Sequence, residues 1–196
     1  MFDLLAVLLM APVVLAVVGI AAAAVAASGG RPIYWQLRVG RRGEVFRCWK
    51  LRTMVRGAEV RLAALLAADE ALAAEWRVNQ KLAKDPRITR IGRFLRRTSL
   101  DELPQLWNVA MGQMSLIGPR PFTPEQAMTY EAGAGSSAYY RLRPGVTGLW
   151  QVSRRNAGTF AERVQWDRAY AERLSFAGDL AILLRTVGVV LKATGQ

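Results

Sequence analysis

The apolar segment FDLLAVLLMAPVVLAVVGIAAAAVAA, residues 2–27, constrains the fold more than any other part of the chain. A helix of this length reaches about 39 Å at 1.5 Å per residue, which exceeds the ~30 Å hydrocarbon core of a bilayer. A cleaved secretory signal is disfavoured, because such signals begin with positive charge and this segment begins with Asp3. The segment therefore predicts a helix embedded in a membrane.

Pro12 leaves two paths open for that helix. It lies about ten residues from the start, ~15 Å along the helix and near mid-bilayer depth. A spanning anchor would keep the following basic domain in the cytoplasm. A kink at the proline would instead return both ends to one face, as a re-entrant helix. Because Pro-kinked spanning helices also occur, the residues alone do not decide.

Charge narrows the expected partners. The chain has 27 Lys and Arg residues against 15 Asp and Glu, a net charge of +12, and every basic residue follows position 30. Such a balance suits an anionic membrane surface, phosphorylated substrates or nucleic acid. The apolar segment favours the membrane, and no known nucleic-acid-binding motif is present. We therefore expect membrane lipids, and no nucleic acid, among the partners.

Residue usage also limits the chemistry. The chain has no histidine, which excludes Ser-His-Asp catalysis, Cys-His catalysis and histidine-based metal sites. The single cysteine, Cys48, excludes an intramolecular disulfide and is interpreted as a packing residue in a reducing compartment. Any reaction must use carboxylates, Lys, Arg, hydroxyl groups or tyrosine.

Residues 29–196 predict one small α/β domain that is mostly helical and membrane-associated. GRRGE at 40–44 predicts a hairpin turn between two short strands. Residues 55–78 are rich in Ala, Leu and Glu and predict a helix that covers the surface. The segments 111–124 and 139–156 are rich in Gly and Pro, which predicts loops, and their Arg, Tyr and Trp residues indicate ligand contact.

Two further segments predict amphipathic helices. In DPRITRIGRFLRR at 85–97, apolar residues at helical spacing are interleaved with arginines, which is typical of a helix in a membrane interface. A basic face over a protein core stays open as the alternative. SFAGDLAILLRTVGVVLKATG at 175–195 carries three charges, which disfavours a second span. We expect it to pack on the core or on the membrane surface.

The motif TSLDELPQLWNV at 98–109 places two carboxylates, Asp101 and Glu102, side by side. Pro104 is tolerated in a first turn, so a short helix would begin near Asp101. One interpretation is structural, with Asp101 as N-cap and Ser99 and Glu102 as a capping box. The other is chemical, with Asp101 held ionised at the helix N-terminus as a nucleophile toward phosphorus and Glu102 as a Mg²⁺ ligand. The spacing permits both.

The chain resembles the bacterial sugar transferases, the monotopic phosphoglycosyl transferases that begin exopolysaccharide and O-antigen synthesis. The resemblance runs nearly end to end, and SLDELPQLWNV followed by GPRP is a highly specific signal. The insertion before KLAKDPRIT resembles the hexose-1-phosphate branch. The resemblance rests on FDLL at 2–5, Pro12, Gln36-x-Arg38-x-Gly40, Phe46, KLRTM at 50–54, DPRITRIGRFLRRTSLDELPQLWNV at 85–109, MSLIGPRP at 114–121, RPGVTGLWQVS at 143–153, Asp167 and Tyr170.

The resemblance implies a two-step reaction. Asp101 attacks the β-phosphate of a UDP-sugar, UMP leaves, and a polyprenol phosphate then takes the sugar phosphate from the aspartate. Glu102 would hold Mg²⁺, and a cis proline bond would lie near Arg120. The implied substrate-binding residues are Arg120, Pro121, Arg97, Arg155, Lys50 and Arg52.

The resemblance also implies a location. Residues 1–28 would form a re-entrant helix broken at Pro12 and inserted from the cytoplasmic face of the bacterial inner membrane. Residues 29–196 would form the catalytic domain, and a homodimer stays open. Two residues depart from the family pattern. Ala11 stands where a serine usually precedes the breaking proline, and Arg154 stands where the family favours glycine, which affects the kink and the ligand contacts.

Two alternatives belong to other functional classes. One is a non-catalytic basic adaptor at the membrane, and the other is a membrane-tethered glycosyl transferase that releases UDP. The nucleotide product separates them, because phosphosugar transfer releases UMP. The residues do not indicate which sugar is used.

Overall fold

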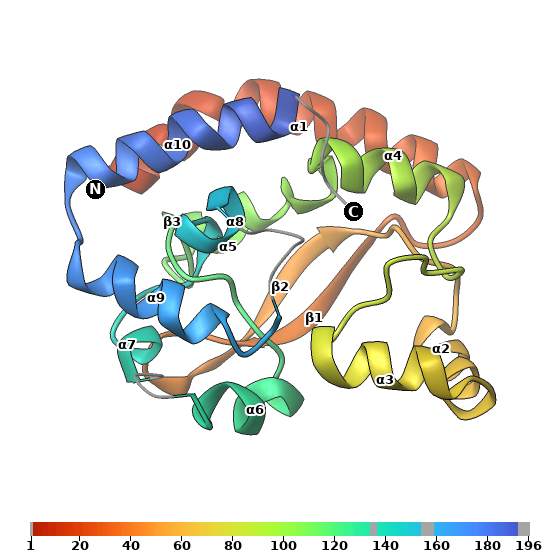
Figure 1. The fold of residues 1–196 in the computed structure, drawn as a ribbon. Coiled ribbons are helices and arrows are strands. Elements are labelled where there is room, and N and C mark those ends of the chain that lie inside the picture. The colour runs from red at the N-terminus through yellow and green to blue at the C-terminus, as the bar shows by residue number, and fades with distance from the viewer. Residues whose placement is uncertain (1, 134–136, 154–158, 192–196) are drawn as a thin grey trace.

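The computed structural model describes residues 2–133, 137–153 and 159–191. Figure 1 shows a layer of long helices lying above a β-hairpin and a group of shorter helices. The layer consists of α1 (Phe2–Ala27), α4 (Arg90–Thr98) and α10 (Phe176–Leu191). The described chain is mostly helical with two small sheets, which confirms the predicted α/β class.

α1 runs through Pro12 without interruption. The break expected there is therefore absent from the helical geometry of residues 2–27. A proline removes one backbone hydrogen bond from the helix interior, and here the residues on both sides remain helical despite that loss. Among the described residues, α1 is the one helix long and apolar enough to cross a bilayer.

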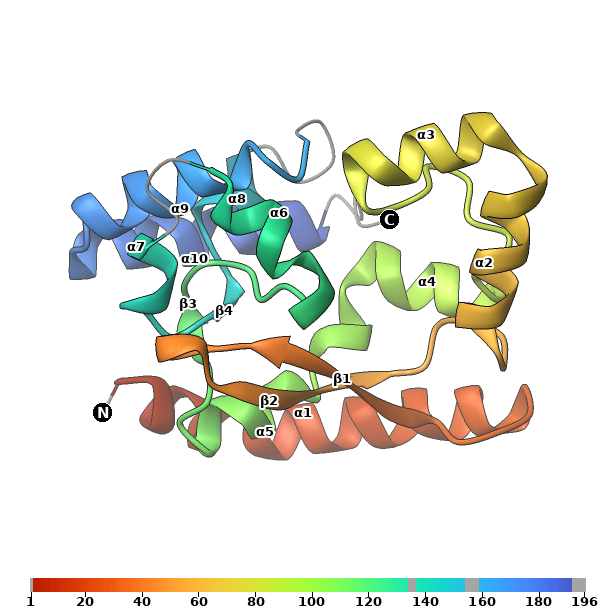
Figure 2. The same cartoon turned by 90° about the horizontal axis from the view of Figure 1, so that it is seen from below.

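Both ends of α1 are bonded to the rest of the protein. Near its start, the Asp3 carboxylate accepts a hydrogen bond from Ser115 Oγ at 2.9 Å. At its end, the Arg52 guanidinium donates to the carbonyls of Val25 and Gly29. Figure 2 shows the helix lying along the domain over its whole length.

β1 (Ile33–Val39) and β2 (Val45–Leu51) form the antiparallel hairpin that GRRGE predicts. The turn contains the 3-10 helix η1 (Arg41–Gly43), in which Arg42 and Gly43 adopt positive φ angles of 60° and 82°. The predicted turn and strands are confirmed.

Residues 55–78 contain two helices where one was predicted, namely α2 (Ala58–Ala68) and α3 (Glu70–Asn79). Asp69 separates them with an extended backbone, and its carboxylate accepts hydrogen bonds from the backbone N–H groups of Ala71 and Leu72. Aspartate is a weak helix former but a strong N-cap, so it ends α2 and begins α3.

α4 is capped by Thr89, whose hydroxyl accepts a backbone hydrogen bond from the first turn. Its Leu95 is buried in a core cluster with α1 and β2, while Phe94 is exposed. Arg87, predicted on the basic face of this helix, precedes it and is buried in an ion pair with Asp85. One face of α4 therefore packs on the core, and both interpretations of this helix stay open.

The two segments predicted as loops each contribute a short strand, because β3 (Ser115–Ile117) and β4 (Gly145–Thr147) pair in parallel. No peptide bond among the described residues is cis, so the cis proline expected near Arg120 is wrong. The remaining elements are η2 (Leu100–Glu102), α5 (Gln105–Ala110), η3 (Pro124–Gln126), α6 (Ala127–Glu131), α7 (Ser137–Tyr140), α8 (Leu149–Ser153) and α9 (Arg163–Glu172).

Three clusters of buried side chains hold these elements together. One joins α1, α5, α9 and α10 to the hairpin, a second joins α1 and α4 to β2, and the third is an aromatic cluster beneath the hairpin turn. Because α1 contributes to two of them, this helix packs against the predicted catalytic domain. The aromatic cluster contains Phe122, Tyr130, Tyr139 and Phe160.

The two longest helices of this layer expose apolar side chains. α1 and α10 lie in the same layer (Figure 1), and both expose large hydrophobic side chains. Extended apolar surfaces of this kind are rare on soluble monomers and indicate a membrane or another apolar partner. The exposed side chains include Leu5, Leu8, Leu9, Val13, Leu15 and Ile20 on α1, and Phe176, Leu180, Leu184 and Val187 on α10.

Candidate active site

The two adjacent carboxylates lie in η2, a single 3-10 turn between α4 and α5. Ser99 adopts a left-handed conformation, with φ of 59°, which ends α4 and redirects the chain. α5 begins at Gln105, with Pro104 as its N-cap residue. Asp101 is therefore not the helix N-cap that the sequence suggested, and the observed N-cap lies three residues later.

The side chain of Glu102 lies between two cations from distant parts of the chain. Its Oε1 accepts from Lys50 Nζ on β2 at 2.9 Å and from Arg120 Nη2 at 2.8 Å. Burial acts to raise the pKa of Glu102, but the charges of Arg120 and Lys50 outweigh it and hold the pKa well below its usual range. Glu102 is thus an ionised carboxylate in an ion-pair network, which its predicted role in a capping box would not produce.

Asn108 explains why Lys50 and Glu102 meet. This fully buried residue of α5 accepts a hydrogen bond from Trp49 N at 3.1 Å and donates one to the Arg47 carbonyl at 2.7 Å. It therefore sets the position of η2 and α5 along β2. No sequence pattern indicated this role, because a lone asparagine in a helix has many uses.

Asp101 has a different environment from its neighbour. Its side chain is buried, with 8% exposure, and within the described residues its carboxylate has no hydrogen bond or ion pair. Burial, followed by the charge of Glu102, raises its pKa to about 6. Asp101 therefore does not lie at the helix N-terminus that was expected to keep it ionised, and desolvation and a like charge raise its pKa instead. Above pH 6 the group is a desolvated carboxylate without a partner, which suits a nucleophile.

The loop that carries Arg120 is fixed on both sides. Gly118 N donates to the Thr147 carbonyl and Gly145 N donates to the Pro119 carbonyl, so β3 and β4 hold its start. The two strands approach so closely that a Cβ on Gly145 would lie 2.1 Å from Gly118 N. Arg120 is thereby presented to Glu102 from a rigid segment.

More positive than negative side chains surround the carboxylates. Arg163 donates a hydrogen bond to the Arg120 carbonyl, and Arg38 donates one to the Pro121 carbonyl. Burial lowers the pKa of both guanidinium groups, and the charge of Arg120 acts in the same direction. With Lys50 these are four cations against Asp101, Glu102 and Asp167. A site of this composition attracts phosphate groups.

The remaining predicted substrate residues do not contact Asp101 or Glu102 where the structure describes them. Arg52 is bonded to the end of α1, and Arg97 is exposed in the last turn of α4. Arg96, which the sequence did not single out, is the α4 arginine whose charge lowers the pKa of Asp101. Pro121 is buried and contributes its carbonyl to Arg38. Arg155 and the family departure at Arg154 lie outside the described residues.

Glu102 and Asp101 together form a donor set that fits Mg²⁺. This ion is commonly bound through one or two carboxylates plus phosphate oxygens, and the described residues contain no larger cluster of acidic or sulfur ligands. Glu102 Oε1 is occupied by Lys50 and Arg120, while Oε2 has one long contact of 3.4 Å to Arg120. Oε2 and the Asp101 carboxylate are therefore the available ligands.

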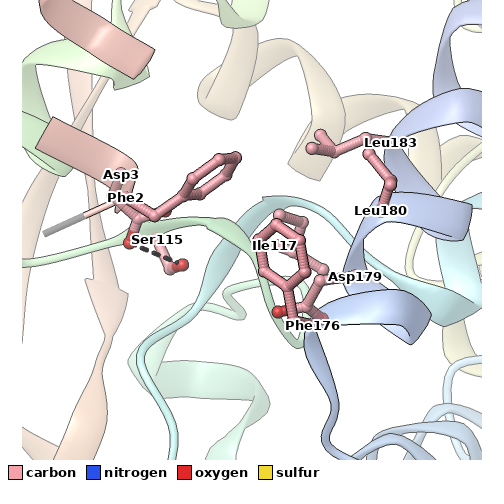
Figure 3. Close-up of a pocket in the computed structure, with 8 residues that line it drawn as sticks. All are labelled: Phe2, Asp3, Ser115, Ile117, Phe176, Asp179, Leu180 and Leu183. Carbon is pink, nitrogen blue, oxygen red and sulfur yellow. Dashed lines mark hydrogen bonds between the residues drawn. The ribbon is translucent and has the colours of Figure 1, made fainter. Parts of the chain in front are cut away.

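A separate cavity of about 200 Å³ lies between the start of α1 and α10. Figure 3 shows Phe2 and Asp3 on one side of it, and Leu180 and Leu183 on the other. None of its lining residues belongs to the carboxylate cluster. It is a gap in the apolar layer and not the candidate active site.

The family profile described as "Bacterial sugar transferase" matches residues 1–193. The chain is 48% identical over 195 residues to a UDP-galactose-lipid carrier transferase of Erwinia amylovora, covering 99% of this chain and 40% of that protein. It is 39% identical over 193 residues to the exopolysaccharide production protein ExoY of Sinorhizobium fredii, covering 98% and 83%.

A third relative is the UDP-glucose:undecaprenyl-phosphate glucose-1-phosphate transferase of Klebsiella pneumoniae, which is 34% identical over 186 residues. The match covers 92% of this chain and 36% of that protein. The chain thus spans about two fifths of the length of several curated relatives and most of the length of ExoY.

Proposed function

The chain belongs to the bacterial sugar transferase family, and from that premise we propose that it transfers a sugar-1-phosphate from a UDP-sugar to a polyprenol phosphate, releasing UMP. The product would begin an exopolysaccharide or O-antigen. The observation that carries the proposal is a buried Asp101 that accepts no hydrogen bond from the described residues, beside a Glu102 that two cations hold in place. The names of the relatives describe transfer to a lipid carrier or to undecaprenyl phosphate.

In the first proposed step, an oxygen of Asp101 attacks the β-phosphorus of the donor. The bond from that phosphorus to the bridging oxygen breaks, and UMP leaves with that oxygen. Arg120 and Lys50 contribute positive charge where negative charge develops on the phosphoryl oxygens. Glu102 would hold a Mg²⁺ ion, which would supply further neutralisation of phosphate charge.

In the second step, a phosphate oxygen of the polyprenol phosphate attacks the same phosphorus. The bond to Asp101 breaks, the carboxylate is restored, and a polyprenyl-diphosphate sugar is formed. The burial of Asp101 protects the aspartyl phosphate from water between the steps. The 48% identical relative is named for UDP-galactose and the 34% identical one for UDP-glucose, so UDP-galactose is the first donor to test.

The decisive experiment follows the β-phosphate. Purified protein in lipid is incubated with UDP-galactose or UDP-glucose labelled at that phosphate, with Mg²⁺ and no acceptor. We expect UMP and a labelled protein whose label maps to the peptide containing Asp101, and added polyprenol phosphate should move the label to lipid. Release of UDP would instead indicate simple glycosyl transfer, and absence of any nucleotide product would favour the non-catalytic adaptor.

We also propose that the protein is monotopic, at the cytoplasmic face of the bacterial inner membrane. A helix that crosses a bilayer carries one end about 30 Å from the other, whereas both ends of α1 are bonded to the same domain. The exposed apolar sides of α1 and α10 would enter the lipid together, and Pro12 would allow α1 to bend there. Tags at the two ends of the chain should both react only from the cytoplasmic side. A tag at the N-terminus that reacts from the periplasm would establish a span.

A further inference from the structure

The loop Pro119–Phe122, which carries Arg120, has an unusual set of backbone contacts. All four of its successive carbonyls accept a hydrogen bond from another part of the chain. Pro119 accepts from the backbone of Gly145, and Phe122 accepts from the backbone of Val39 at 2.9 Å. The two carbonyls between them accept from arginine side chains. The two prolines contribute no N–H groups, so the loop depends on these outside donors.

Arg163 is the donor to the carbonyl of Arg120. It begins α9, is 4% exposed, and lies over the rings of Trp150 at 5.2 Å and Phe160 at 5.0 Å. Among the residues that the structure describes, its buried Nε has no hydrogen-bond partner. Asp167, one turn further along α9, is the carboxylate whose charge acts on it most strongly, although no ion pair within 4 Å joins them.

Arg38 is the donor to the carbonyl of Pro121, at 3.2 Å. Its other terminal nitrogen donates to Gln36 Oε1 at 2.6 Å, so its position on β1 is fixed. Within the described residues Arg38 forms no ion pair with a carboxylate. Two arginines from distant elements therefore hold adjacent carbonyls of one loop.

Simple packing does not account for this arrangement. Burying a guanidinium without an ion pair is costly, and a neutral donor could satisfy a single carbonyl. Arg163 bonds to the carbonyl of Arg120 itself, and Arg38 bonds to the carbonyl of the next residue, Pro121. The guanidinium of Arg120 contacts Glu102 at 2.8 Å. Their positions are therefore tied to the placement of Arg120.

We propose that Arg163, together with Arg38, is a positioning residue that holds the 119–122 loop so that the Arg120 guanidinium faces Glu102 and the phosphates of the donor. The role rests on the proposed phosphosugar transfer. A displacement of about 1 Å at a group that stabilises a transition state can cost as much as about 100-fold in rate. Loss of the Arg163 contact should therefore reduce turnover more than substrate binding.

The test compares Arg163→Met and Arg163→Lys with Arg168→Met. Arg168 lies on the same helix but is exposed and pairs with Glu172, so its replacement should change turnover by less than about twofold. We expect Arg163→Met to lower kcat for UMP release by about 100-fold with KM changed less than about threefold. Arg163→Lys keeps the charge and one donor, and it should recover part of that loss.

Melting temperatures of the variants separate positioning from folding. If Arg163→Met does not fold, Arg163→Lys decides, with an expected fall in kcat of about tenfold at an unchanged melting temperature. An unchanged kcat in a folded Arg163 variant, or an effect confined to KM, would overturn the proposal. Wild-type release of UMP is measured in the same assay, so a failure of the proposed function is seen independently.

A double-mutant cycle shows whether Arg163 acts through Arg120. In an Arg120→Ala background, the residual release of labelled UMP should change less than about threefold when Arg163→Met is added, because the side chain to be positioned is gone. If Arg163→Met has its full effect in both backgrounds, it acts by another route and the proposal fails. If the turnover of the Arg120→Ala protein is too low to measure, the effects of the single Arg163 variants on kcat and on KM decide.

Discussion

Two buried aspartates, Asp101 in η2 and Asp167 in α9, have pKa values raised to about 6 by burial, yet their surroundings differ. Asp167 accepts a hydrogen bond from the Tyr130 hydroxyl at 2.7 Å and lies near the charge of Arg163. The Asp101 carboxylate accepts no hydrogen bond within the described residues, and the charge of Glu102 adds to its burial, while the charges of Lys50, Arg96 and Arg120 act against both. A similar pKa therefore arises in a satisfied side chain and in an unsatisfied one.

The comparison shows that the pKa alone does not identify a nucleophile. A carboxylate that already accepts a strong hydrogen bond is held in place and is less available for attack, whereas an unpartnered one retains its lone pairs. Asp167 also lies on the face of α9 that carries Arg163, four residues earlier on the same helix. We therefore interpret Asp167 as support for the Arg120 loop and Asp101 as the reacting group.

The largest effect should come from replacing each aspartate by asparagine. Asp101→Asn removes the nucleophile and should lower UMP release by about 10⁴-fold or more, with no labelled intermediate. Asp167→Asn should slow the reaction by about 10- to 100-fold, because it disturbs Arg163 and hence Arg120. Release of UMP from labelled donor measures both variants.

The remaining turnover of Asp167→Asn distinguishes the two roles. In the Asp167→Asn protein, the labelled phosphate should still map to the peptide that contains Asp101, because the reaction path is unchanged. A labelled intermediate in Asp101→Asn, or a label on Asp167 in the wild type, would reverse the assignment. Both variants must retain membrane association and a cooperative melting transition for the comparison to hold.

The sequence predicted the local features of this site and fold well. The apolar helix, the hairpin turn and the helical C-terminal segment follow from composition and short-range spacing, which act within a few residues. The carboxylate pair itself was also visible in the sequence. Lys50 and Arg120 were named as substrate residues from the family resemblance, and the structure brings both to Glu102.

The sequence could not predict contacts that depend on tertiary packing. Arg96 and Arg97 are adjacent, and only the rotation of α4 on the core decides which one faces Asp101. Arg163 carries no local signal, because its partner is a backbone carbonyl 43 residues away. The raised pKa of Asp101 also depends on burial, which a capping pattern does not reveal.

A smaller effect concerns stability. The folded state raises the pKa of Asp101 to about 6 from an ordinary value near 4, so it binds the proton more tightly than the unfolded chain. Wild-type stability should therefore fall as the pH rises from about 4 to about 6, and the difference corresponds to as much as about 3 kcal/mol at pH 8. Asp101→Asn removes this loss and should melt at a higher temperature at pH 8 without Mg²⁺.

The same substitution at Asp167 should give no such gain. Asparagine there leaves the buried Arg163 without the opposing charge that acts on it most strongly, and this cost offsets the benefit of removing a desolvated carboxylate. Melting curves of both variants and the wild type at pH 4 and pH 8 measure the contrast, and the advantage of Asp101→Asn should vanish at pH 4, where the wild-type carboxyl is protonated in the folded state. An Asp101→Asn protein that is no more stable than the wild type at pH 8 would mean that Asp101 has a partner in solution. The distinction between the two aspartates would then lose its basis, because Asp101 would also have a bonding partner, as Asp167 has in Tyr130.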